Sequence, residues 1–283
     1  MSWGVRRTRV RGTAPTCHYH HEGDPVKTLY ILPTLLLALS SCGLPSLALH
    51  PRLGAMDVEG HLAANTDVAP VATTTDDLGL GEGEDEMMPR ADFEWIGMHL
   101  SASQFTAAYS GSGQVTAKID LGGDVIDMGE DVNTDLDLDV TSIHHTWDLI
   151  PGETVEAGIG LGVALIDFQT RMEAMTLAPG NKVETSESIP VPLLAARLGL
   201  KFGPVSISGV AGFLQISDGE NEAAVTDLDI MAGYEVFSGT GASLGVNVGY
   251  RQFDFEANYD DGASTVDLDL GLSGIYYGIS LAF

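Results

Sequence analysis

Carboxylates recur at alternate positions between residues 135 and 269, a spacing that could gather cations. Alternate residues of a β-strand point to the same face, so each run would put its carboxylates on one side of a sheet. Leu or Phe fills the position between each pair. Hard oxygen ligands suit Ca²⁺ or Mg²⁺, and a ring of carboxylates attracts cations. This acidic set consists of Asp135, Asp137, Asp139, Asp227, Asp229, Asp254, Glu256, Asp267 and Asp269.

Two locations are open to the acidic set. A carboxylate turned toward lipid would lose its hydration, so these side chains should face the lumen of a barrel or rise above the bilayer. In the lumen they would form a cation-attracting mouth, and divalent cations would be candidate partners. Above the bilayer they would only keep strand ends and loops soluble.

The few basic residues would need acidic partners inside a barrel. Alternation turns Arg197 and Arg251 inward, and a buried charge is tolerated only when it is paired. We therefore expect lumenal ion pairs that brace the barrel, with a gating or selectivity role as the alternative. The residues expected to form them are Arg197, Arg251, Glu156 and Glu235, with Asp167 as a further acidic candidate.

Histidines offer little support for catalysis. His144 and His145 are adjacent, and neighbouring residues of a strand face opposite sides, so at most one of them points inward. No flanking pattern marks a serine nucleophile, which a lipid-modifying barrel enzyme would need beside a base. We predict no catalytic residue, no cofactor and no metal site, and the lipid-modifying enzyme is the least favoured alternative.

An apolar run over residues 29–41 predicts a secretory signal peptide. Lys27 precedes the run and Cys42 follows it, and the run is shorter than the roughly 20 residues that a spanning helix needs. Residues 39–42 (LSSC) resemble the lipobox of bacterial lipoproteins, which implies lipidation of Cys42. The alternative is an ordinary signal peptide that happens to end near a cysteine.

Residues 1–25 fit a leader poorly, because a long basic preamble precedes the apolar run. Val26 is the expected true start, with a GUG codon read as the initiator, which would make the Cys and His residues at 17–21 an artefact of the gene model. No second ligand group follows them at zinc-like spacing. Residues 1–42 are therefore expected to be a signal peptide with a misannotated extension.

The next residues, 43–92, are rich in Pro, Thr, Ala and acidic residues and have no sustained period, which predicts a flexible acidic linker. Residues 93–283 then alternate between apolar and small or polar residues, which is typical of a transmembrane barrel. Short turns at Pro151-Gly152, Gly203-Pro204 and residues 239–241 alternate with longer polar connections. We predict an antiparallel up-and-down barrel of eight strands at residues 94–120, 125–149, 154–173, 183–202, 205–217, 222–238, 242–259 and 264–283.

Alternation also assigns the two faces of the predicted barrel wall. Val155, Ile159 and Leu161 would face lipid, which leaves Gly158 and Gly160 in the lumen. An eight-stranded barrel has an interior that side chains just fill, so a wide aqueous channel is not expected.

The last strand carries the most specific pattern. Ile275, Tyr277, Ile279, Leu281 and Phe283 share one face, and Phe283 is the final residue. This resembles the C-terminal signature of outer-membrane proteins, which the barrel-assembly machinery recognises. The assembly signal is expected at Tyr277, Ile279, Leu281 and Phe283.

The barrel region resembles a group of predicted outer-membrane β-barrel proteins of Gram-negative bacteria without an established activity. The matching pieces are HTWDLIPGE at 145–153, GIGLGVALIDF at 158–168, GYRQFDF at 249–255 and the closing LSGIYYGISLAF. The resemblance implies architecture and location in the outer membrane, and it carries no catalytic residue.

The net charge of −27 excludes a nucleic-acid partner, because phosphate binding needs clustered Lys and Arg. The expected partners are outer-membrane lipid and the assembly machinery. The sequence thus predicts a non-catalytic outer-membrane barrel with a structural or interaction role. The alternative is a narrow cation-preferring channel, or a barrel that binds divalent cations.

Overall fold

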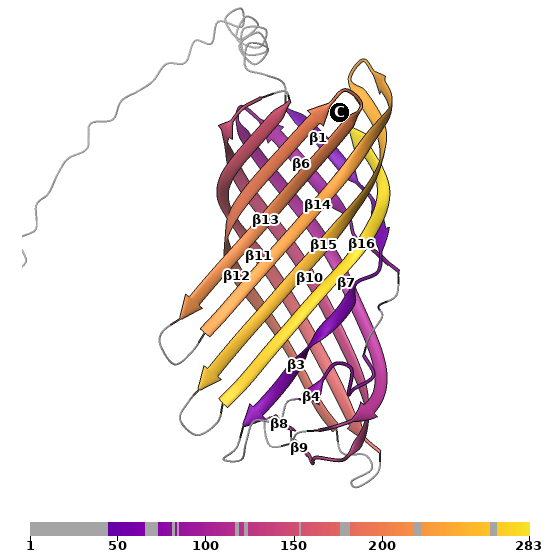
Figure 1. The fold of residues 1–283 in the computed structure, drawn as a ribbon, viewed down its shortest axis with the longest axis vertical. Coiled ribbons are helices and arrows are strands. Elements are labelled where there is room, and N and C mark those ends of the chain that lie inside the picture. Colours follow the sequence, from indigo (N-terminus) through magenta and orange to yellow (C-terminus); the bar gives the residue numbers. More distant parts are fainter. Residues whose placement is uncertain are drawn as a thin grey trace, which may run out of the picture. The chain divides into compact units, whose positions relative to one another are not determined.

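In a computed structural model, the part of the chain after residue 44 forms an antiparallel β-barrel (Figure 1). The structure describes residues 45–65, 73–80, 83, 85–116, 119–121, 124–152, 154–175, 182–217, 222–260 and 265–283. The expected signal peptide and Cys42 lie outside the described residues. No helix in the described part is long and apolar enough to span a bilayer.

Eight long strands form most of the wall, each paired antiparallel with the next. They occupy the eight segments in which the sequence alternates, so this part of the prediction is confirmed. The bounds are β7 Met98–Gln114, β10 Asp131–Ile150, β11 Val155–Ala174, β12 Lys182–Phe202, β13 Val205–Ser217, β14 Glu222–Gly239, β15 Ala242–Asp260 and β16 Thr265–Ala282.

The prediction of eight strands is nevertheless wrong, because the wall has ten. The segment expected to be a linker supplies two further strands, each broken into three short pieces. The first consists of β1 Ser46–His50, β2 Arg52–Gly54 and β3 Asp57–Asn65, and the second of β4 Thr73–Thr74, β5 Glu86–Met87 and β6 Arg90–Trp95. Pro51 and Pro89 stand at two of the breaks, where the ring removes a ladder donor. These breaks hide the period of two that would have revealed the strands.

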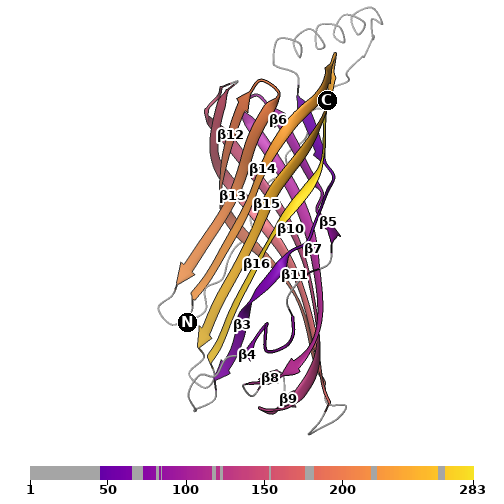
Figure 2. The ribbon, with the colours of Figure 1, turned by 45° about the vertical axis from the view of Figure 1, so that its right-hand side comes forward.

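The first and last strands close the barrel. β1 pairs with β16 through Ala48 opposite Ala282 and Leu49 opposite Leu281, and β2 and β3 continue along β16 (Figure 2). Leu47 and Phe283 exchange backbone hydrogen bonds of 2.9 and 3.2 Å. The chain segment taken for a linker therefore provides the seam on which closure depends.

The predicted tight turns at 151–152, 203–204 and 239–241 lie together at one end of the barrel, here named the short-turn end. Gly203 and Gly241 have φ of 59° and 87°, a backbone conformation that glycine adopts without strain. The longer connections near 178–181 and 218–221 lie outside the described residues. At the opposite end, named the far end, β8 Ile119–Leu121 and β9 Asp124–Ile126 pair antiparallel as a separate sheet. Residues 122–123, where the first tip was expected, lie outside the described residues.

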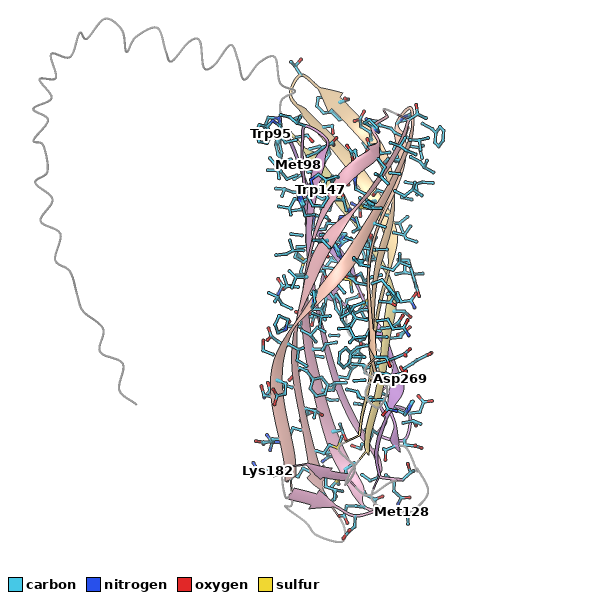
Figure 3. The ribbon with its side chains drawn as sticks, turned by 90° about the vertical axis from the view of Figure 1, so that its left-hand side faces the viewer. Trp95, Met98, Met128, Trp147, Lys182 and Asp269 are labelled. Atoms are coloured by element: carbon cyan, nitrogen blue, oxygen red, sulfur yellow. The ribbon has the colours of Figure 1, made fainter. Side chains whose placement is uncertain are left out.

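The polarity of the wall inverts partway along the barrel, as β10 and β11 show. On β10 the exposed face runs from Asp135 and Asp137 at the far end to Ile143 and Trp147 at the short-turn end, while the buried face runs from Leu138 to His144. The half of the barrel toward the short-turn end, here named the near half, is therefore apolar outside and polar inside, as lipid requires. The half toward the far end, named the far half, has the reverse arrangement, which is that of a water-soluble protein. Figure 3 shows Trp95 and Trp147 at the short-turn end and Met128 and Lys182 at the far end.

A turn at residues 74–77 lies in the far half and leads into two buried apolar residues. The Thr74 amide donates to Asp77 Oδ2 and the Asp77 amide donates to Thr74 Oγ1, both at 3.1 Å. Hydrogen bonds from the Thr74 amide and the Thr74 side chain lower the pKa of the half-buried Asp77 carboxyl, because they favour its charged form. The turn carries the buried Leu78 and Leu80 into the apolar core.

Candidate functional site

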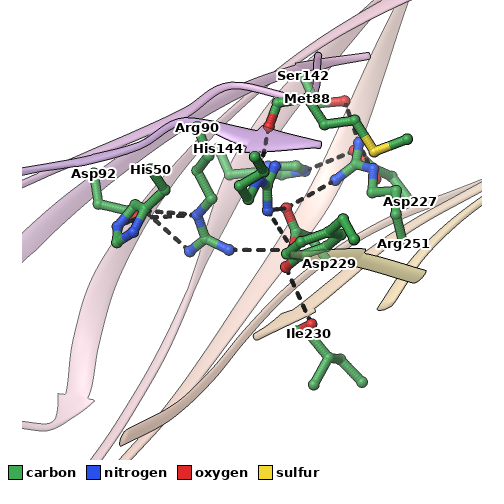
Figure 4. A network of polar contacts seen from close by, with 12 residues as sticks. His50, Met88, Arg90, Asp92, Ser142, His144, Asp227, Asp229, Ile230 and Arg251 are labelled. Atoms are coloured by element: carbon green, nitrogen blue, oxygen red, sulfur yellow. Dashed lines mark hydrogen bonds and ion pairs between the residues drawn. The ribbon is translucent and has the colours of Figure 1, made fainter. Parts of the chain in front are cut away.

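A buried network of charged side chains crosses the interior at the level where the polarity inverts, with Asp229 on β14 at its centre (Figure 4). Arg52 Nη1 donates to both carboxylate oxygens of Asp229, at 3.0 and 2.8 Å, and the Tyr276 hydroxyl donates to Oδ1 at 2.5 Å. Arg251 and Arg90 approach the same carboxylate at 3.5 and 3.6 Å. Three arginines from β2, β6 and β15 thus share one aspartate.

Asp92 on β6 forms a second centre toward the short-turn end. Arg90 Nε and Nη2 both donate to its carboxylate, a bidentate pair with distances of 2.9 to 3.1 Å. His50 Nε2 lies 3.1 Å from Asp92 Oδ2, and His99 Nε2 lies 3.6 Å from Oδ1. His50 also hydrogen-bonds Ser280 at 3.0 Å, which links β6 to the closing strand.

Asp227 is the third acidic member and has no exposed surface. Arg251 Nη2 lies 2.7 Å from Asp227 Oδ1 and donates to Ser142 Oγ at 3.3 Å, while His144 Nε2 is 3.6 Å from Asp227 Oδ2. The three arginines and three aspartates of the network balance one another's formal charge. Charge balance is what allows such a cluster to be buried.

A smaller ion-pair cluster lies nearer the short-turn end. Arg197 on β12 donates to Glu156 at 2.5 Å and to Asp148, which joins β10, β11 and β12. The expected lumenal partners Arg197 and Glu156 are thus brought together. Arg251 pairs with Asp227 and Asp229 instead of Glu156 or Glu235. Glu235 lines a cavity of about 190 Å³ near the short-turn end.

Glycines make room for the large side chains of the network. A Cβ atom on Gly162 would lie 2.7 Å from His144 Cδ2, and one on Gly212 would lie 2.7 Å from His144 Nε2. Gly249, opposite Tyr276 on the neighbouring strand, lies directly beneath the tyrosine ring. Three glycines, Gly162, Gly212 and Gly249, therefore leave the space that the side chains of His144 and Tyr276 occupy.

Beyond the network, apolar side chains close the interior of the far half. Phe105 and Phe253 meet edge to face with centroids 5.9 Å apart, and Arg251 lies 5.3 Å from the centroid of the Phe105 ring. Leu138, Val225 and Leu272 continue the buried cluster. Paired charges are therefore followed directly by a packed hydrophobic core.

The structure separates the acidic set that the sequence grouped together. Asp227 and Asp229 are buried in the interior, whereas Asp135, Asp137, Asp139 and Glu256 are exposed on the outer wall of the far half, and Asp254 and Asp269 are half-buried on the same outer face. The side chain of Asp267 is not described. The acidic set is therefore divided between the two locations that the sequence left open. Asp227 and Asp229 lie inside the barrel, and the other described members lie on the outer face of the far half, where a bilayer would no longer demand apolar residues.

Sequence reasoning missed the network residues that lie before β7. Arg52, Arg90, Asp92 and His50 all fall in the expected linker, where basic residues are rare. The short alternation in residues 90–95, RADFEW, was the available signal. Among the residues that the structure describes, no group of three or more His, Cys, Asp or Glu side chains is placed to hold a metal ion.

The chain matches no protein-family model and no curated protein. Among solved structures, it resembles the outer-membrane protease OmpT of Escherichia coli with a TM-score of 0.52 and 8% identity, over 84% of this chain and 97% of that one. Weaker likenesses include OprG of Pseudomonas aeruginosa (TM-score 0.38, 10% identity, 84% and 95% covered) and Ail of Yersinia pestis (0.27, 7%, 81% and 98%). At such identities only the fold is shared, and that fold is the closed antiparallel barrel of Gram-negative outer-membrane proteins.

Proposed function

We propose that this chain is an outer-membrane barrel with a closed lumen and a structural or interaction role at the cell surface. One observation carries the proposal: two successive layers fill the interior, the charge network around Asp229 and the apolar core that begins at Phe105 and Phe253. An ion crossing the barrel would have to separate buried ion pairs and then enter a dry core. Both steps are costly, because each removes a charge from its compensating partners.

The outer face of the far half supports the interaction role. It carries exposed carboxylates beside hydroxyl groups, such as Asp135 next to Ser110 at 2.9 Å and Asp139 next to Thr106 at 2.5 Å. A polar wall of this kind is suited to water and to a partner outside the membrane. Its negative charge would steer a cationic partner toward the barrel.

Conductance in planar bilayers tests the closed lumen against the cation-channel alternative. Purified wild-type protein should give no steady ion-selective current. The double variant Phe105→Ala with Phe253→Ala, which removes the aromatic contact beyond the network, should leak and so shows that insertion can be detected. Ile159→Ala, on the outer wall, should behave as wild type. Reproducible cation-selective steps from the wild type would overturn the proposal.

A further inference from the structure

The lipid-facing wall has a groove at the seam between the first and last strands, with a volume of about 480 Å³. Its floor is a pair of alanines, Ala91 on β6 and Ala102 on β7, which lie directly opposite each other. Both belong to one row of outward residues that also contains Leu281, Leu49 and Ile143. Larger apolar side chains therefore flank two methyl groups, which makes a hollow in the apolar belt.

Two prolines border the hollow and explain why the wall is interrupted there. The β1–β6 ladder ends at His50 opposite Arg90, and the β2–β5 ladder begins at Leu53 opposite Met87. Pro51 and Pro89 lie at this interruption and have no N–H with which to bridge it. Their carbonyls remain in use, since they accept hydrogen bonds from Ile279 and Gln104 at 3.2 and 3.0 Å.

The groove lies at the edge of the lipid-facing belt that is nearer the far end. Gln104 and Thr141, which lie opposite each other, border it on the side of the far half, and the exposed Asp139 follows two residues beyond Thr141. The apolar residues Leu49 and Leu281 form part of the remaining border, and the other lining residues are His50, Pro51, Pro89, Arg90 and Ser103. The hollow is thus continuous with the surface that meets lipid and lies next to the level at which exposed charges begin.

We propose that this groove holds an acyl chain of a membrane lipid in the leaflet nearer the far half. An extended chain can lie over Ala91 and Ala102 against Leu49 and Leu281, with its polar end beside Gln104 and Thr141. The surrounding lipid is as apolar as the groove, so the preference comes from closer van der Waals packing around one chain. The inference rests on the membrane location of the barrel and is independent of whether the lumen conducts.

Native mass spectrometry of the full chain, released from detergent micelles that contain increasing phosphatidylethanolamine, tests the groove. The wild type should retain one more lipid than Ala102→Phe, whose ring fills the hollow. Its apparent affinity for phosphatidylethanolamine should be about fivefold higher than that of the variant. Ala232→Phe places the same bulk on the outer face of β14, away from the groove, and should retain lipid as the wild type does.

A second variant and a folding assay keep the outcome decisive. Ala91→Leu fills the groove from the opposite strand with a smaller side chain and should also lose the extra lipid. Heat-dependent migration in detergent gels identifies which variants are folded. Equal lipid retention by the wild type and a folded groove variant would overturn the proposal, as would an equal loss in Ala232→Phe. Either result would leave the proposal of a closed lumen unaffected, because that proposal is tested separately by the conductance of the wild type.

Discussion

At the scale of single residues, the stability of the charged interior depends on one carboxylate, that of Asp229, which three guanidinium groups share. Asp229 compensates Arg52 at 2.8 Å and lies within 3.6 Å of Arg90 and Arg251, and all four residues are at most 4% exposed. Arg90 has Asp92 and Arg251 has Asp227 as second acidic partners. Arg52 has no other acidic partner in the described part of the interior, although it donates to the Met88 carbonyl at 2.7 Å and stacks over Tyr276.

Asp229→Asn should therefore destabilise the barrel strongly. The substitution keeps the shape but leaves buried guanidinium groups without their shared counter-charge, which costs about 3–5 kcal/mol. The free energy of unfolding of the detergent-solubilised protein in urea measures the effect. Asp137→Asn is the matched control, because Asp137 is exposed on the outer wall, and it should change stability by less than about 0.5 kcal/mol. Similar losses for the two variants would show that the network does not stabilise the barrel.

At the scale of the elements, closure is concentrated in a seam between strands from opposite ends of the chain. β16 bonds β1, β2 and β3 in turn, so three short strands together complete one edge. Phe283 exchanges two backbone hydrogen bonds with Leu47 at the end of this seam, and its side chain is 59% exposed on the outer face. An open edge in lipid would leave backbone groups unsatisfied at several kcal/mol each.

Deleting Phe283 should therefore impair assembly. The deletion removes both bonds to Leu47 together with the terminal aromatic residue of the predicted assembly signal. The yield of heat-modifiable protein in outer-membrane fractions should fall severalfold, while Ala282→Ser should do little because its neighbours Gly278 and Ser280 share the inward face. Unchanged yield and heat-modifiability after the deletion would show that Phe283 neither closes the barrel nor directs its assembly.

At the scale of the whole barrel, the inversion of polarity sets the depth in the membrane. Ile159 and Asp137 are both exposed on the protein surface, yet one lies in the apolar belt and the other on the acidic wall beyond it. A belt on the outer face of the near half satisfies lipid, while the far half needs water on its outside. The far half should project from the cell.

Cysteine labelling of intact cells checks this depth. Asp137→Cys should react with a membrane-impermeant maleimide, whereas Ile159→Cys should react only after detergent extraction and unfolding, because lipid covers it. The unsubstituted chain gives the background from its own cysteines. Labelling of Ile159→Cys in intact cells as fast as Asp137→Cys would contradict the proposed position of the belt.

The sequence by itself determined the eight long strands, their tight turns and the faces of the near half. Alternation is a local property, so Val155 and Gly158 could be assigned to opposite faces without knowledge of any neighbour. The two broken strands before β7 were missed because their alternation is interrupted between the pieces, the longest of which, β3, has nine residues. Their place in the wall depends on two pairings: β3 pairs with β16, which is distant in sequence, and β6 pairs with β7.

Only the tertiary structure decided which carboxylates would lie inside. Asp135-Leu136-Asp137 and Asp227-Leu228-Asp229 have the same local pattern, yet the first pair of aspartates is exposed and the second is buried. A period of two defines two faces but does not say which one points inward. Leu136 joins the apolar core of the far half, whereas Asp227 and Asp229 meet arginines that other strands bring to the middle of the barrel. The direction of each side chain is set by its depth along the barrel and by partners far away in the chain, and neither is encoded in the local pattern.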